Sequence, residues 1–210
     1  MSAIIRSSNK AAFDGTGALK APDDHERGRS GWSEMQEAGP AQTLPVFRQH
    51  PETGLPVEGH LSWGLIPHYA DRRPDFRPIH ARAETISEKQ IFSDAYRKRR
   101  CIVPMNSFYL KDARGKRHAI SRVDGDVFGV AGIWENWRNP DTSQWERTFA
   151  IVTVEANALI AQIHDRMPAV VENSDFKRWT GPEEDPRDLL KPYPSELLKA
   201  SPGIGKSRRP

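Results

Sequence analysis

Short segments rich in apolar and β-branched residues constrain the fold of this chain most strongly. Turn-forming sequences such as Arg114-Gly115-Lys116 and Asp124-Gly125-Asp126 separate them. No alternating strand–helix units and no glycine-rich phosphate loop accompany this pattern, so a doubly wound α/β fold is not expected. The chain is therefore predicted to form a strand-rich α+β domain. The strand candidates are residues 42–48, 61–67, 100–104, 108–110, 118–120, 127–134 and 148–154.

Three segments show helical rather than strand patterns. Residues 83–99 place apolar side chains at helical spacing on a charged background, and residues 156–163 suit a short helix. Residues 174–179 suit another, with Ser174 as its N-cap. The helices are short, so we expect them to flank a sheet rather than to form a layer of their own.

The composition of the chain changes at Gly181. Proline and charged residues recur through residues 181–210, which indicates a tail with a short helix at 195–199 and a disordered end. The folded domain is therefore expected to span residues 1–180.

Cysteine and histidine usage limits the chemistry that is open to the chain. Of its 210 residues, Cys101 is the only cysteine, which excludes an internal disulfide framework and a zinc site built on several thiolates. The seven histidines lack the spacing of metal ligands, so we expect neither a metal nor a cofactor. No run of about 18 apolar residues and no secretory signal is present. We expect a cytoplasmic monomer with no membrane contact.

Charge is unevenly spread along the sequence. Residues 62–118 hold 13 basic and 6 acidic side chains, a net charge of +7, although the whole chain carries only +3. Residues 1–61 carry −2 and residues 119–184 carry −5. A basic middle between acidic flanks is typical of a surface that faces a polyanion, and equally of ordinary solvated charge.

Two clusters combine histidine with charged neighbours. His164, Asp165 and Arg166 follow one another, as a general acid or base with orienting charges would require, or as a structural turn. His80 and Arg82 lie near Glu84 in a second cluster, which also suits a polar helix start.

A third group lies in a proline-bounded loop. Tyr69 offers a ring that can stack on a base, and Arg72 and Arg73 offer charges that can neutralise phosphate. Solvated loop residues are an equal explanation for this group.

Taken together, ordered motifs between about residues 37 and 180 resemble the SOS-response-associated peptidase (SRAP) family, the abasic site processing proteins. One such motif is weak evidence, but the set occurs in family order and at family-like spacing. The motifs are Pro40–Val46, Trp63–Pro67, Ala81–Thr85, Arg99–Pro104, Ser107–Tyr109, Ala131–Glu135, Ile151–Thr153 and Ile163–Pro168.

The resemblance implies a single β-rich α+β domain with mostly antiparallel strands in a barrel-like sheet, flanked by short helices. It also implies a basic cleft for single-stranded DNA and a role in the DNA damage response. In the family, an N-terminal cysteine captures the aldehyde of an abasic site as a thiazolidine, and an asparagine, a glutamate and a histidine assist. Arginines hold the phosphates, and the same cysteine is associated with self-cleavage of a leader peptide.

Carried over by position, the family's residues are only partly present. His164, Arg166, Arg82 and Thr153 match, with Asp165 between the first two. By contrast, residues 1–33 diverge from the start of the family's sequences. Ser2 stands at the position of the family's cysteine, His80 at that of its asparagine and Leu110 at that of its glutamate.

These replacements weaken the covalent chemistry. A serine hydroxyl has no anionic population comparable to that of a thiol with a pKa of about 8.5. An α-amine at Ser2, with a pKa of about 8, still permits a reversible Schiff base with an aldehyde. Leu110 removes a proton carrier that His80 replaces in part, and Cys101 lies in a buried strand pattern that makes it a poor substitute nucleophile.

Three interpretations follow. The first is a protein that binds single-stranded or abasic DNA and has lost most of its covalent chemistry. The second is an active enzyme that uses the Ser2 amine with His164 for abasic-site capture, lyase or peptidase chemistry. The third is a non-catalytic scaffold that no longer binds DNA.

Overall fold

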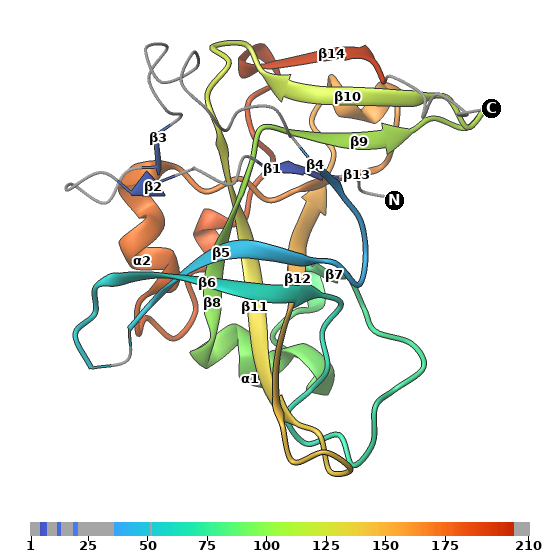
Figure 1. The fold of residues 1–210 in the computed structure, drawn as a ribbon. Helices are drawn as coiled ribbons and strands as arrows, with labels where there is room; N and C mark the ends of the chain where they lie inside the picture. The colour runs from blue at the N-terminus through green and yellow to red at the C-terminus, as the bar shows by residue number, and fades with distance from the viewer. Residues whose placement is uncertain (1–4, 8–11, 14–18, 21–35, 51, 204–210) are drawn as a thin grey trace, which may run out of the picture.

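The computed structural model describes residues 5–7, 12–13, 19–20, 36–50 and 52–203 (Figure 1). The strands are β1 (Ile5–Ser7), β2 (Ala12–Phe13), β3 (Leu19–Lys20), β4 (Gln36–Ala38), β5 (Thr43–Gln49), β6 (Pro56–Trp63), β7 (His80–Arg82), β8 (Arg100–Met105), β9 (Ser107–Lys111), β10 (Arg117–Arg122), β11 (Phe128–Arg138), β12 (Trp145–Glu155), β13 (Arg166–Pro168) and β14 (Leu198–Pro202). The helices are α1 (Gln90–Lys98) and α2 (Phe176–Thr180), with 3₁₀ turns η1 (Ala83–Thr85), η2 (Ile160–Gln162), η3 (Asn173–Asp175), η4 (Arg187–Leu189) and η5 (Ser195–Leu197).

The central sheet closes on itself. Its strands run in the order β11-β8-β5-β6-β12, and β11 also pairs with β12, which completes a five-stranded barrel. Most of the pairings are antiparallel, and β12 pairs in parallel with β6 and β7. The predicted β-rich α+β class with a barrel-like, mostly antiparallel sheet is confirmed. Closure removes the free edges that a short open sheet of this kind would expose.

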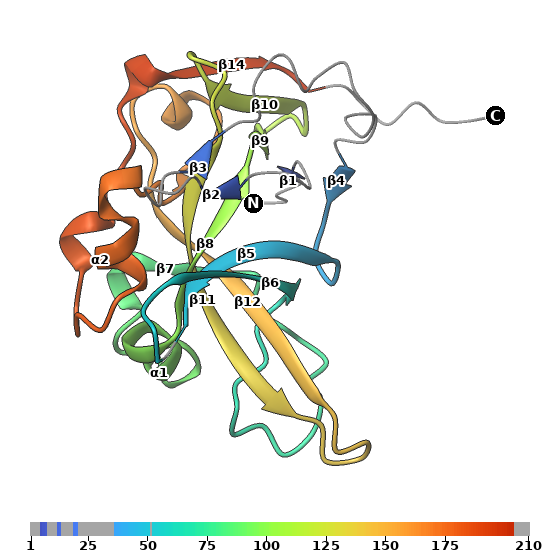
Figure 2. The ribbon, with the colours of Figure 1, turned by 60° about the vertical axis from the view of Figure 1, so that its left-hand side comes forward.

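A second sheet lies across one end of the barrel, with strands in the order β14-β10-β9-β1-β4 (Figures 1 and 2). β14 comes from the segment that the sequence presents as a tail, and it pairs antiparallel with β10. Leu189, Tyr193 and Leu198 of that segment are buried. The chain after residue 180 therefore contributes both a strand and core side chains.

The barrel core is built from large side chains of strands that are distant in sequence. Trp63 stacks on Phe149 with ring centroids 6.3 Å apart, and both rings are fully buried. Phe108 and Phe128 pack together where the two sheets meet. This packing holds the end of β6 against the middle of β12, next to the part of β12 that pairs with β7, and the candidate site forms there.

Several predicted element bounds are wrong. The strand expected at 61–67 is β6, which ends at Trp63 because Gly64 turns the chain with φ +129°. The helix expected at 83–99 is divided into η1 and α1.

Other helices are shorter than expected. Only η2 forms within residues 156–163, because the Asn157 side chain accepts the Ile160 N–H at 2.9 Å and closes a turn. Ser174 lies inside η3 and does not cap α2, which begins at Phe176 without a side-chain cap. Residues 195–199 form η5 and the start of β14 rather than one helix.

Candidate functional site

The register of β12 brings three separate sequence motifs together. Thr153 of β12 is paired with Arg82 of β7 on one side and with Pro168 of β13 on the other. In the same register, His80 is paired with Ile151. Residues some seventy positions apart in the chain thus become neighbours in one sheet.

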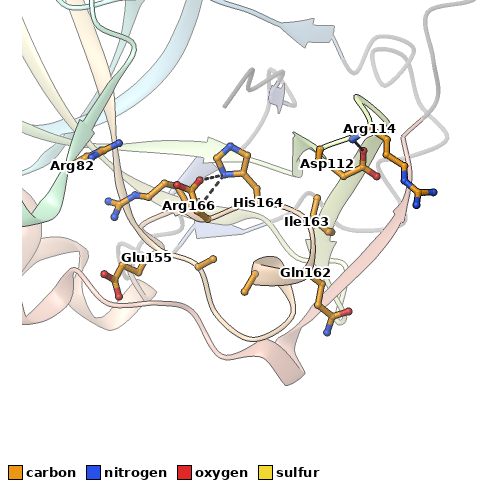
Figure 3. A pocket seen from close by; sticks show the side chains of 12 residues that line it. Arg82, Asp112, Arg114, Glu155, Gln162, Ile163, His164 and Arg166 are labelled. Atoms are coloured by element: carbon orange, nitrogen blue, oxygen red, sulfur yellow. Dashed lines mark hydrogen bonds and ion pairs between the residues drawn. The ribbon is translucent and has the colours of Figure 1, made fainter.

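These residues line a cavity of about 600 Å³. Five residues proposed from the sequence share its wall, namely His80, Arg82, Thr153, His164 and Arg166. A second cavity of about 910 Å³ shares Arg82, His164, Asp165 and Arg166 and continues to the β9–β10 turn at Asp112 and Arg114. The two cavities share these four lining residues, and we call them together the groove; Figure 3 shows His164 between Arg166 and the turn that carries Asp112 and Arg114.

His164 has two alternative partners at one ring nitrogen. Its Nδ1 lies 3.0 Å from the Arg166 backbone N–H and 2.8 Å from a carboxylate oxygen of Asp165. A neutral imidazole with its proton on Nε2 accepts the Arg166 N–H, whereas a protonated Nδ1 donates to Asp165. Nδ1 therefore has a hydrogen-bonding partner in either arrangement.

His80 lies deeper in the groove. Its ring meets Trp63 edge-on with centroids 6.0 Å apart, and its Nε2 is buried without a hydrogen-bond partner among the described residues. Burial, with a smaller contribution from the nearby His164, lowers the pKa of His80 to about 4. At neutral pH this imidazole is uncharged and keeps a free polar atom in the cavity wall.

The two arginines of the site are in different states. Arg166 makes a bidentate ion pair with Glu84, at 2.8 and 2.9 Å, and donates to the Thr153 carbonyl at 2.6 Å. The hydrogen bonds from Arg166 lower the pKa of Glu84 and keep its carboxylate charged. Arg82 is exposed at the wall of the groove and makes no direct ion pair among the described residues, although its charge also lowers the pKa of the nearby Glu84.

The other sequence-predicted DNA contacts do not join this cluster. Tyr69, Arg72 and Arg73 lie on the loop between β6 and β7 and line neither cavity. Tyr69 is half exposed and meets His68 edge-on, while Arg73 pairs with Glu146 on the β11–β12 hairpin, which runs beside this loop in both views (Figures 1 and 2).

Two residues that bear on the covalent chemistry, Leu110 and Cys101, are buried in strands. Leu110 is fully buried in β9, and Cys101 is fully buried in β8, where burial raises the pKa of its thiol. The buried state predicted for Cys101 is confirmed. Ser2 lies outside the described residues.

Sequence reasoning missed several side chains that line the groove, among them Phe76, Lys89 and Arg114. Phe76 carried a usable signal, because it is an aromatic residue in a polar loop between Pro74 and Pro78, four positions before His80. Lys89 and Arg114 looked like any other exposed basic residue.

The described part of the chain offers neither a metal-binding cluster nor a membrane-spanning helix. It contains no group of three or more His, Cys, Asp or Glu side chains placed to hold a metal ion. None of its helices is long and apolar enough to cross a bilayer.

Comparison with known proteins gives a consistent result. Residues 7–204 match the model of the family described as SOS response associated peptidase (SRAP). The abasic site processing protein YoqW of Bacillus subtilis is 37% identical over 151 residues, which cover 68% of this chain and 67% of that protein. The abasic site processing protein HMCES of Gallus gallus is 25% identical over 212 residues, covering 85% of this chain and 62% of that protein.

Solved structures agree on the architecture. A crystal structure of a protein from Bacteroides thetaiotaomicron superposes with a TM-score of 0.70 at 30% identity, covering 76% of this chain and 73% of that one. A protein from Bordetella bronchiseptica superposes with a TM-score of 0.75 at 23% identity, over 97% of this chain and all of that one, and supports the fold alone.

Proposed function

Because the chain belongs to the SOS response associated peptidase (SRAP) family, we propose that it binds single-stranded DNA at abasic sites in the DNA damage response. We place this activity in the cytoplasm, on nucleoid DNA. Covalent crosslinking is reduced, because Ser2 stands where the family's pattern has its nucleophilic cysteine.

The groove carries this proposal. The exposed charge of Arg82 lies at a cavity that also presents two imidazoles and the buried hydroxyl of Thr153. A free guanidinium suits a phosphate, because it offers several donors in a fixed plane. A cavity next to that phosphate site suits a sugar without its base, since no base needs to be accommodated.

The covalent chemistry of the proposed DNA-binding function is limited by the side chains that are present. Two features lower the rate of any covalent step, namely the hydroxyl at Ser2 and the apolar Leu110 at the family's carboxylate position. Loss of a general acid or base typically costs 10²–10⁴-fold in rate. Binding by Arg82 and the groove does not depend on that step, so affinity survives where catalysis is lost.

A second candidate function rests on the two histidines. His80 and His164 line the same cavity, and the uncharged His80 does not repel a cationic imine. If the amine of Ser2 reaches this cavity, its nitrogen adds to the sugar aldehyde and water leaves, giving a protonated Schiff base. His164 then supplies or accepts the proton that such an addition and loss of water require.

One experiment separates these functions. Purified protein is mixed with single-stranded DNA that carries one abasic site, with and without borohydride, and run on a denaturing gel. The same protein is titrated with the abasic strand and with the undamaged strand at several salt concentrations. Arg82→Ala serves as the variant with a weakened phosphate site.

Each outcome has a definite meaning. Binding without a crosslinked band supports the first proposal, and a band that needs borohydride supports Schiff-base capture. A band without reductant contradicts impaired crosslinking. No salt-dependent binding of either strand contradicts both functions and leaves a scaffold role.

A further inference from the structure

The hairpin of β11 and β12 extends beyond the barrel as a two-stranded ribbon (Figures 1 and 2). Its register pairs Asn136 with Arg147 and Arg138 with Trp145. Paired side chains lie on the same face of a sheet, and side chains alternate between the two faces along each strand. One face of the ribbon is therefore formed by Trp134, Asn136, Arg138, Trp145 and Arg147, and we call it the ribbon face.

The opposite face of the ribbon is already covered by the loop between β6 and β7. The Ala70 carbonyl of this loop accepts the Trp137 indole N–H at 2.7 Å, and Arg73 of the same loop pairs with Glu146. Glu135 also belongs to this covered face, where it is buried and paired with an arginine. The carboxylates in this part of the ribbon thus lie on the covered face and have basic partners there.

The ribbon face has the opposite character. Arg138, Trp145 and Arg147 are exposed, and neither arginine makes an ion pair among the described residues. Arg48 of β5 reaches the same end of the barrel, where its guanidinium lies over Trp134, 5.1 Å from the ring centroid. Its Nε is buried without a hydrogen-bond partner in the described part of the chain. Burial, together with the neighbouring charge of Arg147, lowers the pKa of Arg48. Three arginine charges therefore gather at one surface without a paired carboxylate among the described residues.

The edge of β12 beside the ribbon face is open. The Phe149 carbonyl points to this edge, where it accepts the Gly64 N–H at 2.9 Å. Backbone groups alternate in direction along a strand, so Arg147 and Trp145 direct their N–H and C=O groups to the same edge. No described residue forms a backbone hydrogen bond with these groups, because β6 pairs with β12 only at Thr148 and Phe149. An extended segment can therefore be added to β12 at this edge.

An acidic peptide combines the features that this surface requires. Its backbone pairs with the open edge, and every second side chain of an added strand lies on the ribbon face. Carboxylates match the fork of donors that a guanidinium presents. A nucleic acid strand matches the positive charge but lacks the backbone donors and acceptors of a β-strand. Arginine and tryptophan are also the residues most enriched among those that dominate protein–protein binding energies.

We propose that the ribbon face and the β12 edge bind an extended acidic segment of a partner protein, with carboxylates at Arg138 and Arg147. None of the residues of the ribbon face lines the groove. This interaction surface is therefore separate from the proposed DNA site, and the inference goes beyond the proposed function and does not depend on it.

The test uses a fluorescein-labelled peptide in which glutamate alternates with threonine. Its binding to wild type, Arg138→Ala, Arg147→Ala and the double variant is measured by fluorescence anisotropy. Lys199→Ala is the control, because it removes one positive charge from β14, in the sheet at the other end of the barrel (Figure 1). A second peptide of the same sequence is N-methylated at alternate residues, which removes the backbone donors that an added strand needs. Thermal unfolding of each variant checks that the fold is intact.

We expect each single replacement to weaken peptide binding by about threefold and the double variant by about tenfold, as exposed charge pairs do. Lys199→Ala leaves the affinity unchanged, and the N-methylated peptide binds less tightly than its parent. Equal affinity of wild type and the double variant for the peptide overturns the inference, as does a wild-type protein that does not bind it. Equal affinity for the two peptides overturns the addition of a strand to β12.

Binding of abasic single-stranded DNA by the same variants separates this surface from the groove. We expect the double variant to bind the strand as wild type does, and Arg82→Ala to bind the peptide as wild type does. If the double variant loses affinity for the strand and wild type does not bind the peptide, the ribbon face is a nucleic acid surface. That result overturns the inference while the proposed function stands. Peptide binding that depends on Arg138 and Arg147 in a protein that binds no DNA supports the inference and contradicts the proposed function.

Discussion

The imidazole of His80 lies in surroundings that favour its neutral form. Burial lowers its pKa to about 4 from an ordinary value of 6.5. The unfolded chain therefore binds more protons between these values, and stability falls as the pH drops from about 6.5 to 4. A shift of this size corresponds to about 3 kcal/mol. We expect His80→Asn, which cannot titrate, to lose less stability over this range.

Urea denaturation at pH 7.0, 5.5 and 4.5 measures this difference. The control is His60→Asn, because His60 lies on an exposed part of β6 and its replacement leaves the buried imidazole in place. Identical pH profiles for wild type and His80→Asn would show that the imidazole is not buried as described.

Arg166 differs from Arg82 although both lie at the groove. Its bidentate pair with Glu84 and its bond to the Thr153 carbonyl connect β13, η1 and β12. We expect Arg166→Ala to lower the free energy of unfolding by about 1–2 kcal/mol. Arg166→Lys should lower it less, because an ammonium group keeps the charge and some of the hydrogen bonds that the guanidinium makes.

Chemical denaturation tests this, with Arg178→Ala as the control. Arg178 also makes a bidentate pair, but it lies on the surface at α2 with Glu183 and Asp188, where solvent screens the charges. We expect that replacement to leave stability nearly unchanged. If Arg166→Ala loses as little stability as Arg178→Ala, the ion pair between Arg166 and Glu84 contributes little to the stability of the fold.

The difference between these arginines shows where sequence reasoning stops at the residue scale. Motif spacing placed Arg82 and Arg166 at the same site, which the cavity lining supports. It did not reveal that Glu84 already neutralises Arg166, because that contact joins residues 82 positions apart. Long-range pairs of this kind depend on sheet register, which no local pattern specifies.

At the scale of elements, β14 shows the same limit. Charge and proline in the last thirty residues indicated a tail, yet Leu198 begins a strand that pairs with β10. Strands with regular apolar patterns, such as β8 and β12, were located well from the sequence. An edge strand with only one buried residue carries too weak a pattern to be found before its partner is known.

Adjacent leucines test the contribution of β14. Leu198 is 5% exposed and packs in the core, whereas Leu197 is 38% exposed. We expect Leu198→Ala to cost about 2–4 kcal/mol of stability, because it removes buried methyl groups and leaves a cavity. Leu197→Ala should cost less than about 0.5 kcal/mol. Equal effects in urea denaturation would mean that β14 is not part of the cooperative unit.

At the scale of the whole molecule, the small net charge conceals an uneven distribution of basic side chains. The chain carries only +3, while the basic segment 62–118 supplies Arg82, Lys89 and Arg114 to a single groove. Sequence charge located the segment, but folding decides which of its 13 basic side chains face the cavity. Arg100 belongs to the same segment, yet it is buried and donates to backbone carbonyls.

Salt dependence of DNA binding measures how many of these charges meet phosphate. Each phosphate contact on a single strand contributes a slope of about −0.7 to log K against log salt concentration. Contacts from Arg82, Lys89 and Arg114 predict a slope of about −2, and Arg82→Ala should make it shallower by about 0.7. Lys177→Ala removes the same charge at α2, away from the groove, and should leave the slope unchanged. Equal slopes for Arg82→Ala and Lys177→Ala would show that net charge, rather than the groove, attracts the strand.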